Sequence, residues 1–245
     1  MCRLFGAISD SPVDIKNPVL EGVKPFIELS YKHHDGWGIG SIDCLPGGRN
    51  IRIVKAPHPA YRDALFSETV EQLRSPLVIV HLRDAKYGEI SIQNTHPFYS
   101  KGWIFAHNGA MERHKEIEAE LPGVKFKGET DSERYFHLIL KHIRKTGDEA
   151  RGMCSAAGWL EENGFEGGKN FLMSSGRRLY AYRNGRGLFY VVRKNPLTDM
   201  KTVLVASEVL TDEEWRDVPE DHLLVIDDNQ QIVTISVAGK VTTCC

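Results

Sequence analysis

The order of predicted elements along the chain indicates an α+β protein, in which sheets pack together and helices lie outside them. Strand-like segments occupy both ends of the 245-residue chain, and the helical patterns are grouped between them. The last third holds short strand-like segments separated by tight turns, which predicts antiparallel pairing. Each such sheet and helix has an apolar side to bury, so the elements stack as layers around a core.

The first half of the chain alternates between predicted strands and helices. Apolar residues at helical spacing predict helices over 18–30 and 61–73. A turn at Pro46-Gly47-Gly48 is expected between two of the strands. The strands of this half are predicted at 3–9, 37–42, 50–55, 76–82 and 103–106.

The second half begins with two helices whose ends carry clearer signals. Thr130 is an N-cap residue and Glu133 follows three positions later, a capping box in front of an amphipathic run. The second helix covers roughly 148–162 and ends at Asn163-Gly164. Six short strands are predicted after these helices, at 170–174, 178–182, 189–193, 202–207, 222–227 and 231–237.

The composition is that of a globular protein and limits the classes of function. The chain is 41% hydrophobic and 26% charged, and its net charge of -2 provides no basic surface for nucleic acid. No apolar run approaches 18 residues, and the N-terminus lacks the apolar region of a signal peptide. We therefore expect no nucleic-acid partner, no membrane span and a cytoplasmic location.

The cysteines favour a reducing compartment. Their number is odd and their spacing is unpaired, which argues against a disulfide framework. The adjacent pair at the end of the chain could capture a metal or form a crosslink, although a mobile tail is the preferred interpretation. The five cysteines are Cys2, Cys44, Cys154, Cys244 and Cys245.

Cys2 has a chemical prospect that depends on its position. If Met1 is removed, Cys2 carries a thiol and a free α-amine on one residue. The amine has a reference pKa of about 7.7–8.0 and the thiol one of roughly 8.5, so the amine can act as a base for the thiol. The apolar run after Cys2 predicts a strand that would hold the terminus in place. The alternative is a thiol without chemistry.

Several polar residues elsewhere have both a structural and a chemical interpretation. His33 and His34 could bind a metal, but adjacent residues of a strand point to opposite faces, so no metal site is expected. Arg83 can be a solvated charge, Asn108-Gly109 a simple turn, and Asp131 a helix-dipole partner.

Considered together with Cys2, these residues describe a site for amide cleavage. The side-chain amide of Asn108 and the backbone N–H of Gly109 could donate to a tetrahedral oxyanion. Arg83 suits an α-carboxylate and Asp131 an α-ammonium, which together bind an amino-acid head group. The reacting amide then lies one side-chain length away, as in glutamine or a γ-glutamyl amide.

Several motifs occur in order along the chain: Cys2 followed by Arg-Leu-Phe-Gly, the segment from His81-x-Arg83 to Asn94-x-His96-Pro97, His107-Asn108-Gly109, and Thr130-Asp131-Ser132-Glu133. With these motifs the sequence resembles the class II glutamine amidotransferase domains, of the N-terminal-nucleophile (Ntn) hydrolase superfamily. The later motif Ala206-Ser207-Glu208-x-Leu210, followed by Trp215, is similar to the small stand-alone members.

The resemblance implies a four-layer αββα sandwich of two mainly antiparallel sheets, the Ntn-hydrolase fold. It also implies a single amidotransferase domain over residues 2–245. We expect no cofactor and no metal. The implied site residues are the nucleophile Cys2, the oxyanion-hole residues Asn108 and Gly109, the substrate clamps Arg83 and Asp131, and His96, which would shape the pocket.

Two segments depart from the family pattern. Asp84-Ala85-Lys86 stands where many relatives carry Trp-Ala-Thr after the arginine. Lys32-His33 lies near the position of an Arg-Gly pair in synthetase-fused relatives, so the cation is kept and the glycine is lost. Both departures affect the pocket wall and its covering loop, and therefore bear on substrate identity more than on chemistry.

We therefore expect an amidohydrolase that cleaves glutamine or a γ-glutamyl compound through a thioester on Cys2. After Asp131 the chain has room only to finish a two-sheet sandwich, so a fused synthase domain is not expected. One alternative is a glutaminase subunit that passes ammonia to a separate synthase. Another is a non-catalytic glutamine-binding module, if Met1 is retained.

Overall fold

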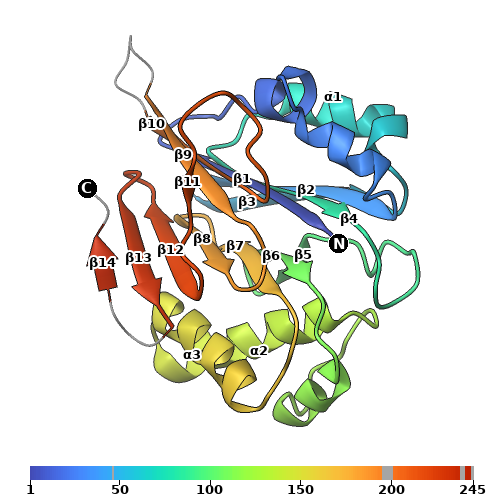
Figure 1. The fold of residues 1–245 in the computed structure, drawn as a ribbon, viewed down its shortest axis with the longest axis vertical. Coiled ribbons are helices and arrows are strands. Elements are labelled where there is room, and N and C mark those ends of the chain that lie inside the picture. The colour runs from blue at the N-terminus through green and yellow to red at the C-terminus, as the bar shows by residue number, and fades with distance from the viewer. Residues whose placement is uncertain (46, 195–200, 238–240, 244–245) are drawn as a thin grey trace.

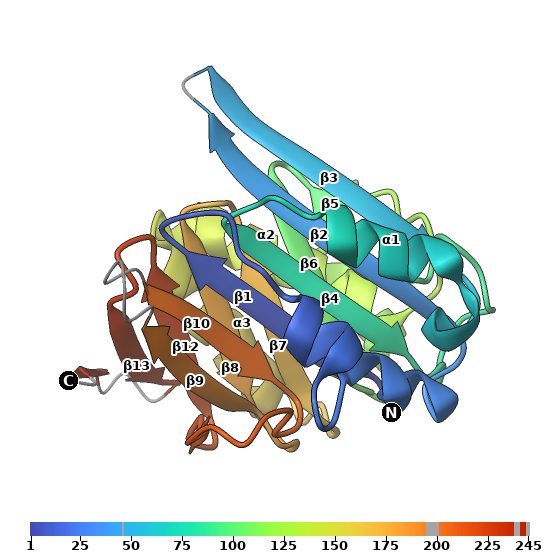
Figure 2. The same ribbon diagram turned by 90° about the horizontal axis from the view of Figure 1, so that it is seen from above.

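The computed structural model describes residues 1–45, 47–194, 201–237 and 241–243. Two seven-stranded sheets form its centre, and helices cover the outer face of each sheet (Figure 1). Every recorded strand pair is antiparallel. The predicted α+β sandwich of four layers is therefore confirmed, and Figure 2 shows the same layers from above.

The first sheet contains the start of the chain, and the second contains most of its later strands. The strands of the first sheet are β1 (Arg3–Ser9), β2 (Gly36–Leu45), β3 (Gly48–Ala56), β4 (Leu77–Arg83), β9 (Phe189–Lys194), β10 (Lys201–Ala206) and β11 (Arg216–Asp217). The strands of the second sheet are β5 (Phe98–Ser100), β6 (Trp103–Gly109), β7 (Lys169–Ser174), β8 (Arg178–Arg183), β12 (His222–Asp227), β13 (Ile232–Ser236) and β14 (Val241–Thr243).

The strand order places β1, at the start of the chain, beside β10, from its last third. The first sheet has the order β11-β9-β10-β1-β4-β2-β3, and the second has the order β14-β13-β12-β8-β7-β6-β5. The α-helices are α1 (Ala64–Gln72), α2 (Asp131–Thr146) and α3 (Glu149–Glu162). Shorter helical segments lie at Asn17–Glu21, Phe26–Tyr31, Ala60–Arg62 and His114–Glu120.

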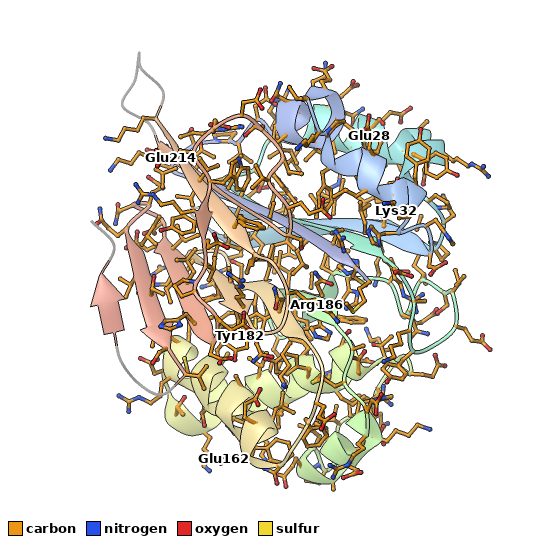
Figure 3. The ribbon with its side chains drawn as sticks, viewed as in Figure 1. Glu28, Lys32, Glu162, Tyr182, Arg186 and Glu214 are labelled. Carbon is orange, nitrogen blue, oxygen red and sulfur yellow. The ribbon has the colours of Figure 1, made fainter. Side chains whose placement is uncertain are left out.

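Alternation along β1 explains how the layers pack. Leu4 and Ile8 join the apolar core between the two sheets, whereas Phe5 joins the core under α1 and the short N-terminal helices. A third core lies between the second sheet and the pair α2 and α3. Figure 3 shows Lys32 on one outer helical layer and Glu162 on the opposite one, with the sheets between them.

The prediction of one helix over 18–30 is wrong, because the chain forms two short helices there instead. Asn17–Glu21 is a π-helix and Phe26–Tyr31 is a 3₁₀-helix. Pro25 separates them in an extended conformation, with φ -66° and ψ 139°. Proline has no N–H to donate and disfavours helical geometry in the residue before it, so the apolar spacing could not be realised as one helix.

The other predicted elements are present with small shifts of their ends, and β5, β11, β14 and the segment His114–Glu120 were not predicted. Parts of two expectations, Pro46 of the predicted turn and the tail at 244–245, lie outside the described residues. Among the described residues no helix is long and apolar enough to cross a membrane.

The start of α2 follows half of its predicted capping box. The Thr130 hydroxyl accepts a hydrogen bond from the Glu133 N–H at 3.2 Å, as expected for an N-cap. The Glu133 carboxylate, however, accepts from the backbone N–H groups of Lys127 and Gly128, at 2.8 and 2.9 Å. The box therefore fixes the approach to α2 as well as its first turn, and so positions Asp131.

Candidate active site

Cys2 lies at the head of β1, beside the loop that leaves β4. Its side chain is buried, with the residue 7% exposed. The thiol sulfur lies 3.4 Å from the backbone nitrogen of Asp84 and 3.6 Å from its carbonyl oxygen. The ammonium group of Met1 pairs with the Asp84 carboxylate. In Figure 1 the N-terminus, marked N, lies close to the start of β1 and the end of β4.

Burial keeps the Cys2 thiol protonated. The pKa of Cys2 is raised from 9.0 to about 11, mainly by burial. The Asp84 backbone N–H and the Met1 ammonium act to lower it, and the negative charges of Asp131 and Asp84 make smaller contributions that raise it. A thiolate is therefore scarce at neutral pH, and the thiol needs a base to react. With Met1 attached, the nitrogen of Cys2 is an amide and cannot be that base.

Arg3 holds the first two peptide groups of the chain. Its guanidinium donates to the carbonyl oxygens of Met1 and Cys2, at 2.9 and 3.1 Å. It also pairs with the Glu208 carboxylate at 2.5 Å. The segment after β10 thus fixes the direction in which the N-terminus leaves β1.

Ser207 connects the head of β1 to the end of β6. Its N–H donates to the Leu4 carbonyl at 2.9 Å, and its hydroxyl oxygen accepts from the Leu4 N–H at 3.0 Å. The same hydroxyl oxygen accepts from the Asn108 side-chain amide at 3.4 Å. The strand of the expected nucleophile and an expected oxyanion-hole residue are therefore joined through one side chain.

Asn108 and Gly109 end β6 in a tightly packed position. Asn108 is 2% exposed, and its side-chain oxygen has no hydrogen-bond partner among the described residues. A Cβ on Gly109 would lie 1.7 Å from the Gly168 carbonyl oxygen and 2.6 Å from Nε2 of His107. Because that oxygen belongs to the backbone, glycine is required here for steric reasons.

Arg83 ends β4 and orders the loop that follows it. Its guanidinium donates to the carbonyl oxygens of Glu89, Tyr87 and Gly88, at 3.0, 3.1 and 3.1 Å. These bonds use three of its five N–H groups and leave two for a ligand. These contacts with the loop were not predicted from the sequence. The sequence analysis interpreted Arg83 either as a solvated charge or as a residue that binds a substrate carboxylate.

Asp131 begins α2 and is 4% exposed. Its carboxylate accepts from the Met111 N–H at 2.9 Å and from the Ser132 hydroxyl at 3.3 Å. It also lies 3.9 Å from Nδ1 of His107. The helix N-terminus favours a negative charge at this position. Its charge also acts on Cys2, so the carboxylate and the thiol belong to one electrostatic environment.

His96 is buried in the segment that leads from β4 to β5. Its ring centre lies 4.1 Å from that of His81 and 4.5 Å from that of Phe98. Neither ring nitrogen has a partner among the described residues. Burial lowers the pKa of His96 well below its usual value, with a smaller contribution from His81.

The structure adds residues to which the sequence assigned no role in the site. Asp84 stood out only as a departure from the family pattern, and Ser207 and Glu208 only as part of a late motif. His33 is buried with Nδ1 3.6 Å from the Asp84 carboxylate, whereas the side chain of His34 is 60% exposed. Among the described residues no group of three or more His, Cys, Asp or Glu is arranged to hold a metal ion.

Solved structures with the same architecture define the class of fold. Glutamine phosphoribosylpyrophosphate amidotransferase from B. subtilis aligns with a TM-score of 0.71 and 18% identity, over 96% of this chain and 49% of that one. A glutamine aminotransferase class-II domain protein from Silicibacter pomeroyi aligns with a TM-score of 0.68 and 19% identity, over 96% and 99% of the two chains. The fold is the two-sheet sandwich of the Ntn-type amidotransferases.

Sequence comparison then gives the family. The family model described as glutamine amidotransferases class-II matches residues 1–201, and the chain belongs to that family. Uncharacterized protein MJ1515 of Methanocaldococcus jannaschii is 31% identical over 262 residues, covering 95% of this chain and 71% of that protein. YafJ of Escherichia coli (strain K12) is 29% identical over 236 residues, covering 92% and 89% of the two chains.

Proposed function

We propose that this chain is an amidohydrolase that cleaves the side-chain amide of glutamine or of a γ-glutamyl compound, with Cys2 as nucleophile once Met1 has been removed. The observation that carries the proposal is the bridge through Ser207, which joins the strand of Cys2 to the amide of Asn108. The negative charge of Asp131 raises the pKa of the Cys2 thiol, which supports a substrate ammonium site close to the nucleophile.

The reaction uses groups of this chain alone. The free α-amine of Cys2 takes the thiol proton, and the sulfur bonds to the side-chain carbonyl carbon of the substrate. The same amine then gives the proton to the leaving nitrogen, and the carbon–nitrogen bond breaks. Water attacks the resulting thioester, which releases glutamate and restores the thiol.

Asn108 and Gly109 are proposed to stabilise the oxyanion of both steps. In the structure the amide nitrogen of Asn108 faces Ser207 and the oxygen is unpartnered. A half-turn of this nearly isosteric amide lets the Ser207 hydroxyl donate to the oxygen and frees the NH2 group for the oxyanion. The backbone N–H of Gly109 is the second proposed donor.

Arg83, Asp131 and His96 are proposed to hold the substrate. The two N–H groups that Arg83 does not spend on its loop suit the α-carboxylate. Asp131 suits the α-ammonium, and the neutral ring of His96 closes the pocket under the loop. Because Arg83 also orders the loop, substrate binding and loop position are coupled.

We also propose that residues 2–245 act as one amidotransferase domain in the cytoplasm. β12 pairs with β8, which supports one unit beyond the segment that the family model matches. The described cysteines Cys2 and Cys154 are free, as in a reducing compartment. The released amine or ammonia either leaves or passes to a separate synthase subunit, and co-purification with a synthase would favour the second course.

The test uses the Cys2→Ala and Cys154→Ala variants, because Cys154 is the other free thiol described, on α3 and away from the site. Released glutamate is measured for glutamine and a panel of γ-glutamyl amides, with intact mass reporting on Met1. Cys2→Ala should abolish turnover and Cys154→Ala should retain it. Full activity of Cys2→Ala would contradict the mechanism.

The contact between Met1 and Asp84 keeps a second candidate open, a module that binds glutamine-like ligands without turnover. A purified chain that retains Met1, binds glutamine and releases no glutamate would favour it.

A further inference from the structure

The Asp84 carboxylate holds a positive charge next to the Cys2 thiol. Its partner is the Met1 ammonium, while its backbone nitrogen lies 3.4 Å from the Cys2 sulfur. The carboxylate is 38% exposed, so it is accessible from solvent. Among the described residues no lysine or arginine is paired with it, and the nearby Arg3 is engaged by Glu208.

Removal of Met1 would take away the ammonium that pairs with Asp84 and would free the α-amine of Cys2, which lies roughly 3 Å from the position of that ammonium. The other neighbour of the carboxylate is His33, whose Nδ1 lies 3.6 Å from it. Burial and the charge of Arg3 lower the pKa of His33 from 6.5 to about 4, so its ring is neutral at neutral pH. When the Cys2 amine is in the neutral form that acts as the base, the processed protein therefore presents an unpaired carboxylate beside its nucleophile.

The space that Met1 occupies is on the side of the leaving group. The α-nitrogen of Cys2 must give a proton to the leaving nitrogen, so the two nitrogens approach within hydrogen-bonding distance, about 3 Å. Met1 is bonded to that same α-nitrogen. Its own ammonium is three bonds away, which is roughly 3 Å from it. A cation at Asp84 would then lie within about 6 Å of the leaving nitrogen, a span of two to four carbon atoms.

We propose that Asp84 forms a subsite for a positively charged group on the leaving amine, so that the preferred substrates are γ-glutamyl amides of short diamines or similar cationic amines. This inference rests on the proposed function, since it needs a γ-glutamyl group on Cys2. The carbon–nitrogen bond that breaks releases the cationic amine with the proton from the Cys2 amine, and water then releases glutamate. Glutamine, whose leaving group is ammonia, has no group that can reach the subsite.

The test compares two γ-glutamyl amides of matched length, one of 1,3-diaminopropane and one of n-butylamine. In the Met1-free protein we expect kcat/KM to be at least about fivefold higher for the diamine amide, the effect of one ion pair at 4 Å in a water-like dielectric. The preference should shrink as salt is added. Asp84→Asn should remove the preference, so that the kcat/KM values of the two amides lie within about twofold of each other.

A matched control makes the same change of charge outside the site. Glu112→Gln alters a carboxylate that is 72% exposed and lies 4.0 Å from Lys86, two residues from Asp84. It should keep the preference for the diamine amide. Loss of the preference in Glu112→Gln as well would overturn the assignment, because a general change in surface charge would then explain it.

Two further outcomes would overturn the subsite. One of them is an equal kcat/KM for the two amides in the Met1-free protein that carries no substitution. The other is an Asp84→Asn variant that slows glutamine and both amides by the same factor, since the carboxylate would then serve the Cys2 amine and not the leaving group.

Calorimetric binding of the same amides separates the subsite from the proposed function. Tighter binding of the diamine amide that is lost in Asp84→Asn supports the subsite even if neither amide is hydrolysed, and only the proposed reaction then fails. Equal binding of the two amides would overturn the subsite whether or not they are hydrolysed.

Discussion

The two halves of the candidate site are held by different forces. The half on β1 and β4 depends on charged side chains, such as the pair of Arg3 with Glu208. The half on β6 and α2 depends on backbone geometry, with Gly109 packed against a carbonyl and Thr130 capping the helix. Charge pairs at the surface are weak and sensitive to salt, whereas steric packing is not. The contacts of the first half should therefore weaken as salt is added, while those of the second half should not.

The largest effect is expected in the half held by backbone geometry. Gly109→Ala places a Cβ 1.7 Å from the Gly168 carbonyl oxygen, and the backbone must move to accept it. We expect the free energy of unfolding to fall by about 3 kcal/mol or more, with loss of turnover. Urea denaturation followed by circular dichroism measures the change.

Gly158→Ala is the matched control for that substitution. A Cβ there meets only Cγ1 of Val237, at 3.6 Å, and Gly158 lies inside α3. Since alanine is favoured over glycine in a helix interior, this variant should be stabilised by up to about 1 kcal/mol. Similar stability of the two alanine variants would contradict the steric account of Gly109.

In the half held by charged side chains, acid should unfold the protein through His33. Its pKa is lowered from 6.5 to about 4 in the folded state, mainly by burial and then by the charge of Arg3. The unfolded chain therefore binds a proton that the folded chain does not, and stability that is present above pH 6.5 is lost as the pH falls toward 4. The contribution is at most about 1.4 kcal/mol per pH unit.

The pH dependence is measured by denaturation at a series of pH values. Between pH 6.5 and 4, His33→Asn should reduce the slope of the free energy of unfolding against pH. The reduction is at most the value for one proton, about 1.4 kcal/mol per pH unit. His34→Asn, at the neighbouring and 60% exposed side chain, should leave the slope as it is. An unchanged slope in His33→Asn would show that His33 is not held neutral in the folded state.

The link between the two halves is tested by Ser207→Ala. Loss of the hydroxyl leaves the buried Leu4 N–H without its acceptor and removes the contact of Asn108. We expect about 1–3 kcal/mol lower stability, together with a fall in kcat, because Asn108 is no longer positioned. Denaturation and glutamate release measure the two effects.

Ser174→Ala provides the comparison for the loss of a buried serine away from the site. Its hydroxyl donates to the Arg178 carbonyl and accepts from the Gly176 N–H, at 2.6 and 2.9 Å. It should lower stability by a similar amount while kcat is kept. A Ser207→Ala variant that also keeps its kcat would contradict the proposed role of Asn108 in the reaction.

The smallest effect is expected at the cap of α2. Thr130→Ala removes the acceptor of the Glu133 N–H and should cost about 1 kcal/mol of stability, whereas Thr130→Ser retains the cap and most of the stability. Thermal unfolding of the three proteins measures this. A loss of activity in Thr130→Ala at a temperature where this variant is still folded would show that the cap also positions Asp131.

The sequence by itself determined those features that have local signals. The β-branched run of β4, the cap at Thr130 and the turns between late strands each depend on a few neighbouring residues, and the structure has them. The motifs around Cys2 also indicated the family and the fold, which the comparisons confirm. Pro25 was a local signal as well, but the apolar spacing on either side of it concealed the break in the helix.

Only the tertiary structure decided how the site is held together. Ser207 contacts Leu4 across 203 positions of the chain, and the Met1 ammonium reaches Asp84 across 83. Such contacts depend on strand order and register, which no local pattern carries. The loop contacts of Arg83 depend in the same way on how the chain folds back after β4. The residue types needed for amide cleavage could therefore be found in the sequence, while the contacts that position them could not.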